Sequence, residues 1–225
     1  ESVAIVPKGK NPKVLPYRIH DVPDPEKLER LRGFVARFGY KLRTEGSKTE
    51  VSKSLNHMLA EVKGRKEEAV VEMVALRAMM KARYSIHNIG HYGLMFQHYT
   101  HFTSPIRRYP DLMVHRLLRE SFETGSIPKE KREKIMEKLA ERADHASQRE
   151  RIAVNAERDT TDLKKVEYMQ QFVGDTFEGI ISSVTSFGFF VELDNGVEGL
   201  VHMTTLKDDY YDYVEEQYAM VGERT

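Results

Sequence analysis

Apolar residues recur at helical spacing in the first part of this 225-residue chain. The pattern predicts three helices, over residues 24–39, 51–62 and 66–84, because steps of three and four residues place apolar side chains on one helix face. Asp24 and Pro25 suit the cap and the first turn of the first helix. The third segment is rich in Ala, Met and Leu, which indicates a buried helix. The expected apolar face of the first helix comprises Leu28, Leu31, Val35 and Phe38.

A second helical region follows an irregular segment. Residues 86–103 contain two interrupting glycines and many histidines and aromatic residues, which favours loop structure. We expect the next helix to begin at Ser104 as its N-cap, with Pro105 in the first position, and to reach about Glu120. Residues 128–172 are highly charged with scattered apolar positions, which predicts one long helix or two stacked helices with a solvated outer face.

The pattern changes to that of β-strands after Gly174. Short apolar runs punctuated by glycine predict strands over residues 177–184, 188–193 and 197–203. The Asp-Asn-Gly segment at residues 194–196 predicts a hairpin turn, because Asn-Gly tolerates the positive φ angles that such turns require. These strands suggest a small barrel or part of one, and together with the helices they predict an α+β fold.

The composition excludes several classes of protein. The chain has no cysteine, so it is neither a disulfide framework nor a thiolate zinc protein. It has no apolar run long enough to span a membrane and no signal-peptide pattern at its start, so we expect no membrane partner and a cytoplasmic location. It begins without methionine and stops in mid-pattern, so we expect a fragment.

The charged residues are unevenly distributed. The 35 basic and 35 acidic residues give a formal net charge of zero, which on its own argues against nucleic-acid binding. From Gly174 onward, however, there are eleven acids and two bases, so this segment carries −9 and the preceding segment +9. The neutral total therefore hides a basic body that suits a polyanionic partner.

In the basic part, residues 98–111 contain many side chains that could bind a ligand or take part in catalysis. Arg107 and Arg108 are expected in the first turn of a helix, where the dipole disfavours cations unless function compensates. Free helix-end amides and a guanidinium form a good phosphate receptor. The structural alternative, in which Arg107 pairs with Asp111 and the aromatic residues belong to the core, stays open. The aromatic residues with faces on which bases can stack are Tyr99, Phe102 and Tyr109.

Histidine spacing offers a rival hypothesis. His87 and His91 are four residues apart, and His98 and His101 are three apart, as in helical metal sites. Neighbouring glycines weaken the helix that this spacing needs, so a histidine-metal hydrolase is a minor alternative. The sequence contains no motif of serine hydrolases, phosphate-binding loops or dinucleotide-binding folds.

Residues 101–112, His-Phe-Thr-Ser-Pro-Ile-Arg-Arg-Tyr-Pro-Asp-Leu, resemble the signature of the RNB exoribonuclease family. Residues 15–28 and 156–159 resemble further stretches of the catalytic domain of that family. The resemblance covers essentially the whole chain. It implies that residues 1–173 form the mainly helical C-terminal part of an RNB catalytic domain.

Residues 174–225 resemble the S1-type OB domain that follows the catalytic domain in this family, and they imply an incomplete five-stranded barrel that binds RNA. The resemblance implies that Phe187, Phe190 and His202 form its nucleic-acid face, where aromatic rings stack on bases. Phe189 is expected to point inward.

The resemblance also implies a reaction. Members of the family degrade single-stranded RNA processively from the 3′ end to nucleoside 5′-monophosphates, with a divalent metal pair, normally Mg²⁺. Arg107 matches the arginine at the scissile phosphate, and Glu157 matches a glutamate near the last nucleotide, so both are expected to be catalytic. The expected RNA-binding residues within the signature are Thr103, Ser104, Arg108 and Tyr109.

The sequence departs from the family in one respect: the closely spaced aspartates that hold the metals have no counterpart in it. We therefore expect no metal ligands in this chain and no activity of the chain alone. The alternative from another class is a non-catalytic RNA-binding segment. In either case the expected partner is single-stranded RNA, and we expect a monomer, as is general in the family.

Overall fold

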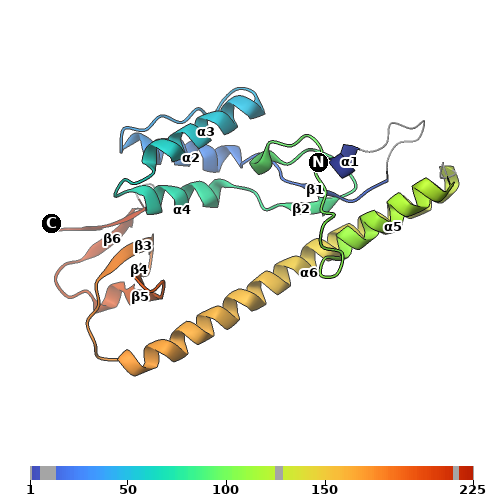
Figure 1. Cartoon of the computed structure of the whole chain (residues 1–225). Coiled ribbons are helices and arrows are strands. Elements are labelled where there is room, and N and C mark those ends of the chain that lie inside the picture. Colours follow the sequence, from blue (N-terminus) through green and yellow to red (C-terminus); the bar gives the residue numbers. More distant parts are fainter. Residues whose placement is uncertain (1, 6–13, 125–128, 215–217, 225) are drawn as a thin grey trace. The chain divides into compact units, whose positions relative to one another are not determined.

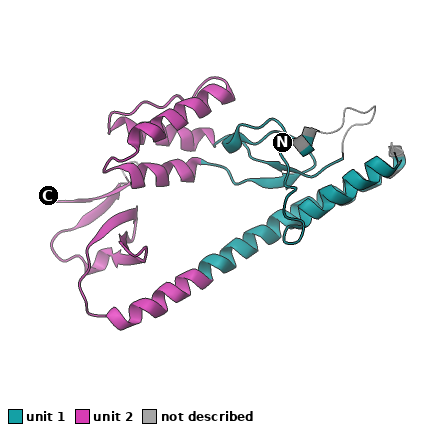
Figure 2. Cartoon of the chain, viewed as in Figure 1, with its two compact units in different colours: residues 1–23, 79–159 teal, residues 24–78, 160–225 magenta. Residues whose placement is uncertain are grey.

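The computed structural model describes residues 2–5, 14–124, 129–214 and 218–224 (Figure 1). It divides into two compact units, residues 1–23 with 79–159 and residues 24–78 with 160–225 (Figure 2). Helices and small antiparallel sheets are both present, so the predicted α+β class is confirmed.

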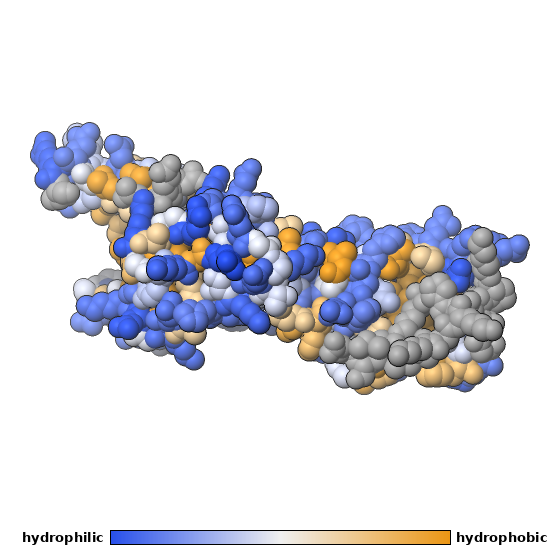
Figure 3. All heavy atoms as spheres, turned by 90° about the horizontal axis from the view of Figure 1, so that it is seen from above, coloured by the Kyte–Doolittle hydropathy of each residue, from blue (hydrophilic) through white to orange (hydrophobic). Residues whose placement is uncertain are grey.

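The mean hydropathy of the chain is −0.55. On the face drawn in Figure 3, apolar residues form small separate patches among hydrophilic ones. Across the described ranges, every helix is too short or too polar to cross a membrane.

Three helices open the unit that contains residues 24–78: α2 (Pro25–Ala36), α3 (Lys48–Val62) and α4 (Glu68–Ala78). The Asp24 carboxylate caps α2 by accepting from the amide of Glu26 at 3.0 Å, as the sequence predicts. The helix α3 begins three residues earlier than expected, because Ser47 and Glu50 form a capping box. The fully buried side chains of these helices are Leu31, Val35, Met58, Val62 and Val71.

Two expectations for these helices are wrong. Phe38 lies beyond the end of α2 and is 44% exposed, because the chain turns there towards Gly39, whose φ is 85°. The helix expected to reach residue 84 ends at Ala78, and Leu76 on it is 74% exposed. Residues 83–85 instead pair with another strand, and this tertiary pairing overrides their helical propensity.

The other unit contains that strand pair. Strand β1 (Tyr17–Ile19) runs antiparallel to β2 (Arg83–Ser85), and α1 (Ser2–Ile5) contributes Ala4 to the core beneath them. The short 3-10 helix η1 (Tyr92–Leu94) lies in the irregular segment that the glycines predict. The core cluster of this unit consists of Ala4, Leu15, Tyr17, Ile19 and Val114.

Two long helices follow in the same unit. Helix α5 spans Tyr109–Thr124, and α6 spans Lys129–Met169, of which the part up to residue 159 belongs here. The charged region is thus one long helix, one of the two expected arrangements. The expected start at Pro128 lies outside the described residues.

The remaining strands belong with residues 160–225. After η2 (Gln170–Phe172), the strands β3 (Gly179–Thr185), β4 (Gly188–Leu193) and β5 (Glu198–His202) form an antiparallel sheet in that order. Gly196, with φ 73°, closes the predicted hairpin turn. Beyond η3 (Met203–Thr205), the strands β6 (Tyr211–Val214) and β7 (Ala219–Gly222) form a separate ladder. The sequence pattern missed both, because tyrosines and acids there obscure the alternation.

Gly188 is the position in this sheet where an added methyl group costs most. Its φ is 154°, and a Cβ there would overlap the Val201 carbonyl oxygen and lie 3.0 Å from the Cα of His202. We expect Gly188→Ala to lower the free energy of unfolding by about 1–3 kcal/mol, measured by urea denaturation.

Gly199→Ala on the neighbouring strand is the matched control, because no described atom lies within 4 Å of its added Cβ. This variant should unfold within about 0.5 kcal/mol of the parent chain. Equal losses for the two variants would contradict the close approach of β4 to β5 at Gly188.

Candidate functional site

A tight turn precedes α5 and carries the two adjacent arginines. The Ser104 carbonyl accepts from the amides of Arg107 at 3.3 Å and Arg108 at 2.9 Å. The Arg108 carbonyl then accepts from the amide of Leu112 at 3.4 Å, which starts the helix. The expectation that Ser104 caps the helix is therefore wrong by about one turn, and Arg107 lies before the helix rather than inside its first turn.

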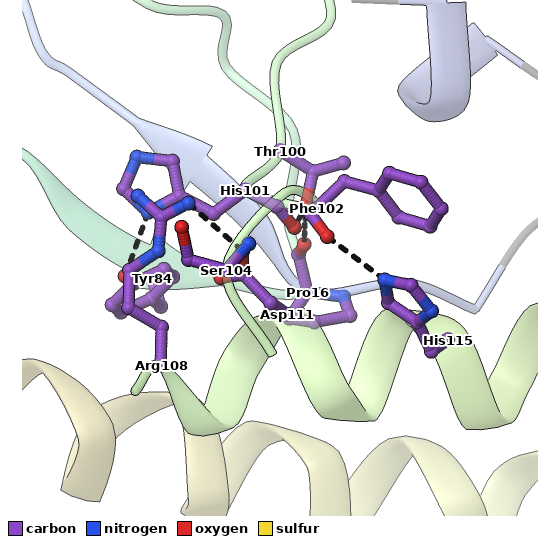
Figure 4. Close-up of polar contacts among 9 residues, drawn as sticks. All are labelled: Pro16, Tyr84, Thr100, His101, Phe102, Ser104, Arg108, Asp111 and His115. Atoms are coloured by element: carbon purple, nitrogen blue, oxygen red, sulfur yellow. Dashed lines mark hydrogen bonds and ion pairs between the residues drawn. The ribbon is translucent and has the colours of Figure 1, made fainter. Parts of the chain in front are cut away.

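The Asp111 carboxylate explains this shift. Asp111 is 0% exposed, and its Oδ2 accepts from the Ser104 amide at 2.8 Å and from Arg108 Nη2 at 2.9 Å (Figure 4). One carboxylate oxygen in the first turn of α5 thus binds both Ser104, at the start of the preceding tight turn, and Arg108, at its end. Sequence reasoning missed this role of Asp111, although its three-residue spacing from Arg108 is a signal for a helical ion pair.

The two arginines consequently differ in their surroundings. The structural alternative paired Arg107 with Asp111, but the partner of Asp111 is Arg108, whose side chain is only 21% exposed. Arg107 is exposed beside Ile106, and none of the described residues pairs with its guanidinium. The Arg107 side chain is thus available to a ligand, whereas that of Arg108 is held in the protein.

The other signature residues that are expected to contact RNA also differ in exposure. Thr103 is exposed and Tyr109 is 44% exposed, while Ser104 is half-buried and uses its amide on Asp111. Phe102 stacks on His115 with ring centroids 4.1 Å apart, and its carbonyl lies 2.8 Å from His115 Nε2 (Figure 4). Phe102 is therefore a framework residue.

A buried polar cluster supports the segment from the strand side. The Thr100 hydroxyl donates to the Pro16 carbonyl at 2.6 Å, and Tyr84 Oη lies 2.8 Å from His101 Nδ1 (Figure 4). Arg18 lies 4.7 Å from the centroid of the Tyr84 ring and forms an ion pair with Glu150 at 2.5 Å.

Burial dominates the electrostatics of this cluster. Desolvation, with the nearby Glu150 carboxylate adding to it, raises the pKa of Tyr84 to about 12. Desolvation, reinforced by the cations of Arg108 and Arg18, lowers the pKa of His101 to about 4. His101 is therefore neutral at physiological pH.

Two of the four histidines that suggested a metal site, His91 and His101, serve as hydrogen-bond partners. His91 Nδ1 accepts from the Leu94 amide at 3.3 Å, and desolvation, with His20 and Arg18 adding, lowers the pKa of His91 to about 4. His20 Nδ1 accepts from the Gly93 amide at 2.9 Å, and its Nε2 lies 2.6 Å from the Met80 carbonyl. Within the described ranges, no group of three or more His, Asp or Glu residues could hold a metal ion. The implied metal pair thus finds no fitting ligand set there.

The three residues expected to face nucleic acid in the strand-rich segment lie together. The ring centroids of Phe187 and His202 are 6.4 Å apart and stacked, and those of Phe187 and Phe190 are 6.3 Å apart. The register pairs Gly188 with His202, which places His202 on the same face as Phe190. Phe187 is 44% exposed and His202 is also exposed, so the group is accessible. Phe189 is half-buried and lies on the other face of β4.

Glu157, the other residue expected to be catalytic, is exposed on α6, seven residues beyond Glu150. Its catalytic role stays a prediction.

Comparisons with known proteins agree with this picture. A family model described as the RNB domain matches residues 3–124, and one described as the S1 RNA binding domain matches residues 170–224. The first model covers more than half of the chain, and the chain belongs to the RNB family.

Several relatives carry the name ribonuclease R. Ribonuclease R 1 of Lactococcus lactis is 49% identical over 210 residues, which are 93% of this chain and 25% of that protein. Ribonuclease R of Aquifex aeolicus is 46% identical, over 93% of this chain and 29% of the relative. Mycoplasma genitalium RNase R, solved in complex with ribose-methylated single-stranded RNA, superposes with a TM-score of 0.84 at 32% identity, over 94% of this chain and 33% of that one. The chain thus spans about a quarter to a third of the length of these proteins.

The lowered pKa of His101 predicts how stability depends on pH. His101 takes up a proton near pH 6.5 in the unfolded chain and only near pH 4 in the folded chain, so its contribution to the free energy of unfolding falls as the pH drops through this window and is constant above it. His101→Gln should reduce the slope of the free energy of unfolding against pH by the equivalent of up to about one bound proton. Urea denaturation at several pH values measures this slope.

His57→Gln is the control for this measurement, because the His57 side chain is 74% exposed. A slope that His101→Gln and His57→Gln change equally would show that burial of His101 does not control it.

Proposed function

We propose that this chain is part of a processive exoribonuclease that hydrolyses single-stranded RNA from the 3′ end to nucleoside 5′-monophosphates. Membership of the RNB family and the relatives named ribonuclease R support this class. The observation that carries the proposal is the exposed Arg107 at a turn that the buried Asp111 holds in place.

Arg107 is the proposed catalytic residue of the chain. A guanidinium binds phosphate oxygens through two parallel hydrogen bonds, and it stabilises the negative charge that develops on them during hydrolysis. The exposed Thr103 hydroxyl and Tyr109 ring flank it and are proposed to contact the neighbouring phosphate and base. Ser104 and Arg108 are proposed to act mainly by holding the turn, since both bond to Asp111.

The second proposed RNA contact is the aromatic group Phe187, Phe190 and His202. Aromatic rings on exposed strands stack on bases without requiring a particular sequence, as a processive enzyme needs. We propose that these residues belong to an RNA-binding domain over residues 174–225, preceded by the RNB part over residues 1–173. The RNA-binding S1 model and the relative solved with single-stranded RNA support this.

The reaction is proposed to depend on divalent metal, normally Mg²⁺, which supplies an activated water and charge neutralisation when bound. No group of acidic residues in the described ranges fits such a site. We therefore propose that the chain alone is inactive and acts within a longer, monomeric protein, where Glu157 contacts the terminal nucleotide.

The second candidate function is RNA binding without catalysis, which the lack of a metal-ligand group among the described residues favours. Incubating the 225-residue chain and a full-length protein with 3′-labelled single-stranded RNA and Mg²⁺ separates the two. Monophosphate release by the full-length protein only is the expected result. Release by neither would favour the binding function, and release by the chain alone would show that its metal site is complete.

Arg107→Ala in the full-length protein tests the proposed catalytic role. Loss of one transition-state contact should lower kcat about 10²–10³-fold, while RNA affinity falls less because other phosphate contacts remain. Single-turnover hydrolysis and RNA binding should be measured on the same preparation.

Lys53→Ala is the control for the loss of one positive charge, because Lys53 is exposed on α3 and far along the sequence from the signature. A kcat of Arg107→Ala equal to that of this control would remove Arg107 from the mechanism.

A further inference from the structure

A groove between α5 and α6 begins beside the signature turn. The long helix α6 returns along α5 (Figure 1). Side chains of the two helices line a hollow of about 210 Å³. Residues of α5 at helical spacing, from Tyr109 to Glu120, line one wall, and residues 135–142 of α6 line the other. The groove is therefore formed by one stripe of each helix.

The floor of this groove is apolar and closed. Met113 and Leu139 are 3% and 4% exposed, and Leu117 and Ile135 are half-buried. Little apolar surface is left for an amphipathic helix to cover, so the chemistry of the groove is decided by its rim.

The rim is strongly cationic. Arg116, Lys138 and Arg142 line it and are exposed, and no ion pair links any of them to another described residue. Glu120 is the one carboxylate among the lining residues described. Three cations against one carboxylate make a surface suited to a polyanion with closely spaced charges.

The position of Tyr109 connects this rim to the proposed catalytic turn. Tyr109 follows Arg108 directly, lines the groove at its signature end and is 44% exposed. Lys138 and Arg142 are one helical turn apart on α6, so their charges follow the groove away from that end. A basic track with an aromatic ring at its start is the arrangement with which proteins bind single strands.

We propose that the groove between α5 and α6 binds single-stranded RNA, with phosphates on Arg116, Lys138 and Arg142 and a base against Tyr109. This inference rests on the proposed function, since it assigns a path to RNA whose scissile phosphate is proposed to lie at Arg107. It adds three basic residues that lie outside the signature.

The test measures how RNA affinity depends on salt. Each phosphate contact that is lost makes the dependence of log K on log salt shallower by about 0.7 for a single strand. The triple variant Arg116→Gln, Lys138→Gln, Arg142→Gln of the 225-residue chain should thus bind an oligoadenylate about ten-fold more weakly at 0.1 M salt, with a slope smaller by about 2. All three residues are exposed, so thermal unfolding should be unchanged.

The matched control removes the same charge elsewhere. Lys53→Gln, Lys63→Gln, Lys66→Gln changes three exposed lysines in and after α3 and should leave the slope unchanged. Glu120→Gln should act in the opposite direction and tighten RNA binding, because it removes the carboxylate of the rim.

The possible failures are distinguishable. If the parent chain binds RNA and both triple variants have equal slopes, the groove proposal is overturned while the proposed function stands. If the parent chain does not bind RNA, both are overturned. If the groove variant weakens binding of polyglutamate as much as that of RNA, the groove is a site for acidic peptides and the RNA assignment is wrong.

Discussion

The buried carboxylate of Asp111 is the interaction on which the rest of the site depends. A carboxylate at 0% exposure is costly unless it is paired and hydrogen-bonded, and Asp111 gains both from the Ser104 amide and the Arg108 guanidinium. Both partners belong to the turn before α5 and bind the same oxygen, Oδ2, so they hold the turn against the first turn of the helix, while Asp111 Oδ1 is buried without a hydrogen-bond partner among the described residues. The adjacent Arg107 is left outside this network and exposed.

Further hydrogen bonds tie the surroundings of this turn to the rest of the unit. The Thr100 hydroxyl ties the preceding loop to Pro16, and the Tyr84 amide donates to the Ser147 hydroxyl on α6 at 2.9 Å. Ser147 is itself buried and donates to the Ala143 carbonyl at 2.8 Å. The turn that carries the exposed Arg107 therefore rests on a frame of buried hydrogen bonds, which suits the phosphate contact proposed for this residue.

Local rules predicted those elements whose signals are local. The cap at Asp24, the hairpin turn at Gly196 and the helical character of the charged region were evident because cap, turn and periodicity each lie within a few residues. That the charged region is one helix rather than two stacked helices was left open by the sequence. The start of α5 was misplaced because a residue seven positions ahead, Asp111, binds the Ser104 amide that a cap would leave free. The expectation that the third helix reaches Tyr84 was wrong, because residues 83–85 pair with β1. This contact joins positions more than sixty residues apart in the sequence, so no local pattern announces it.

The candidate site residues came from the family resemblance, and the structure shows that two of them, Arg107 and Arg108, have different surroundings. Composition left open whether Arg107 binds phosphate or pairs with Asp111. In the structure Arg108 pairs with Asp111, and Arg107 is exposed, so its phosphate contact stays a proposal. The most direct test follows the Nε–H resonances of both arginines by NMR while the 225-residue chain is titrated with single-stranded oligoadenylate. Our account predicts that the Arg107 signal shifts and the Arg108 signal does not. A shift confined to Arg108, or an unchanged Arg107 signal while the RNA binds, would contradict it.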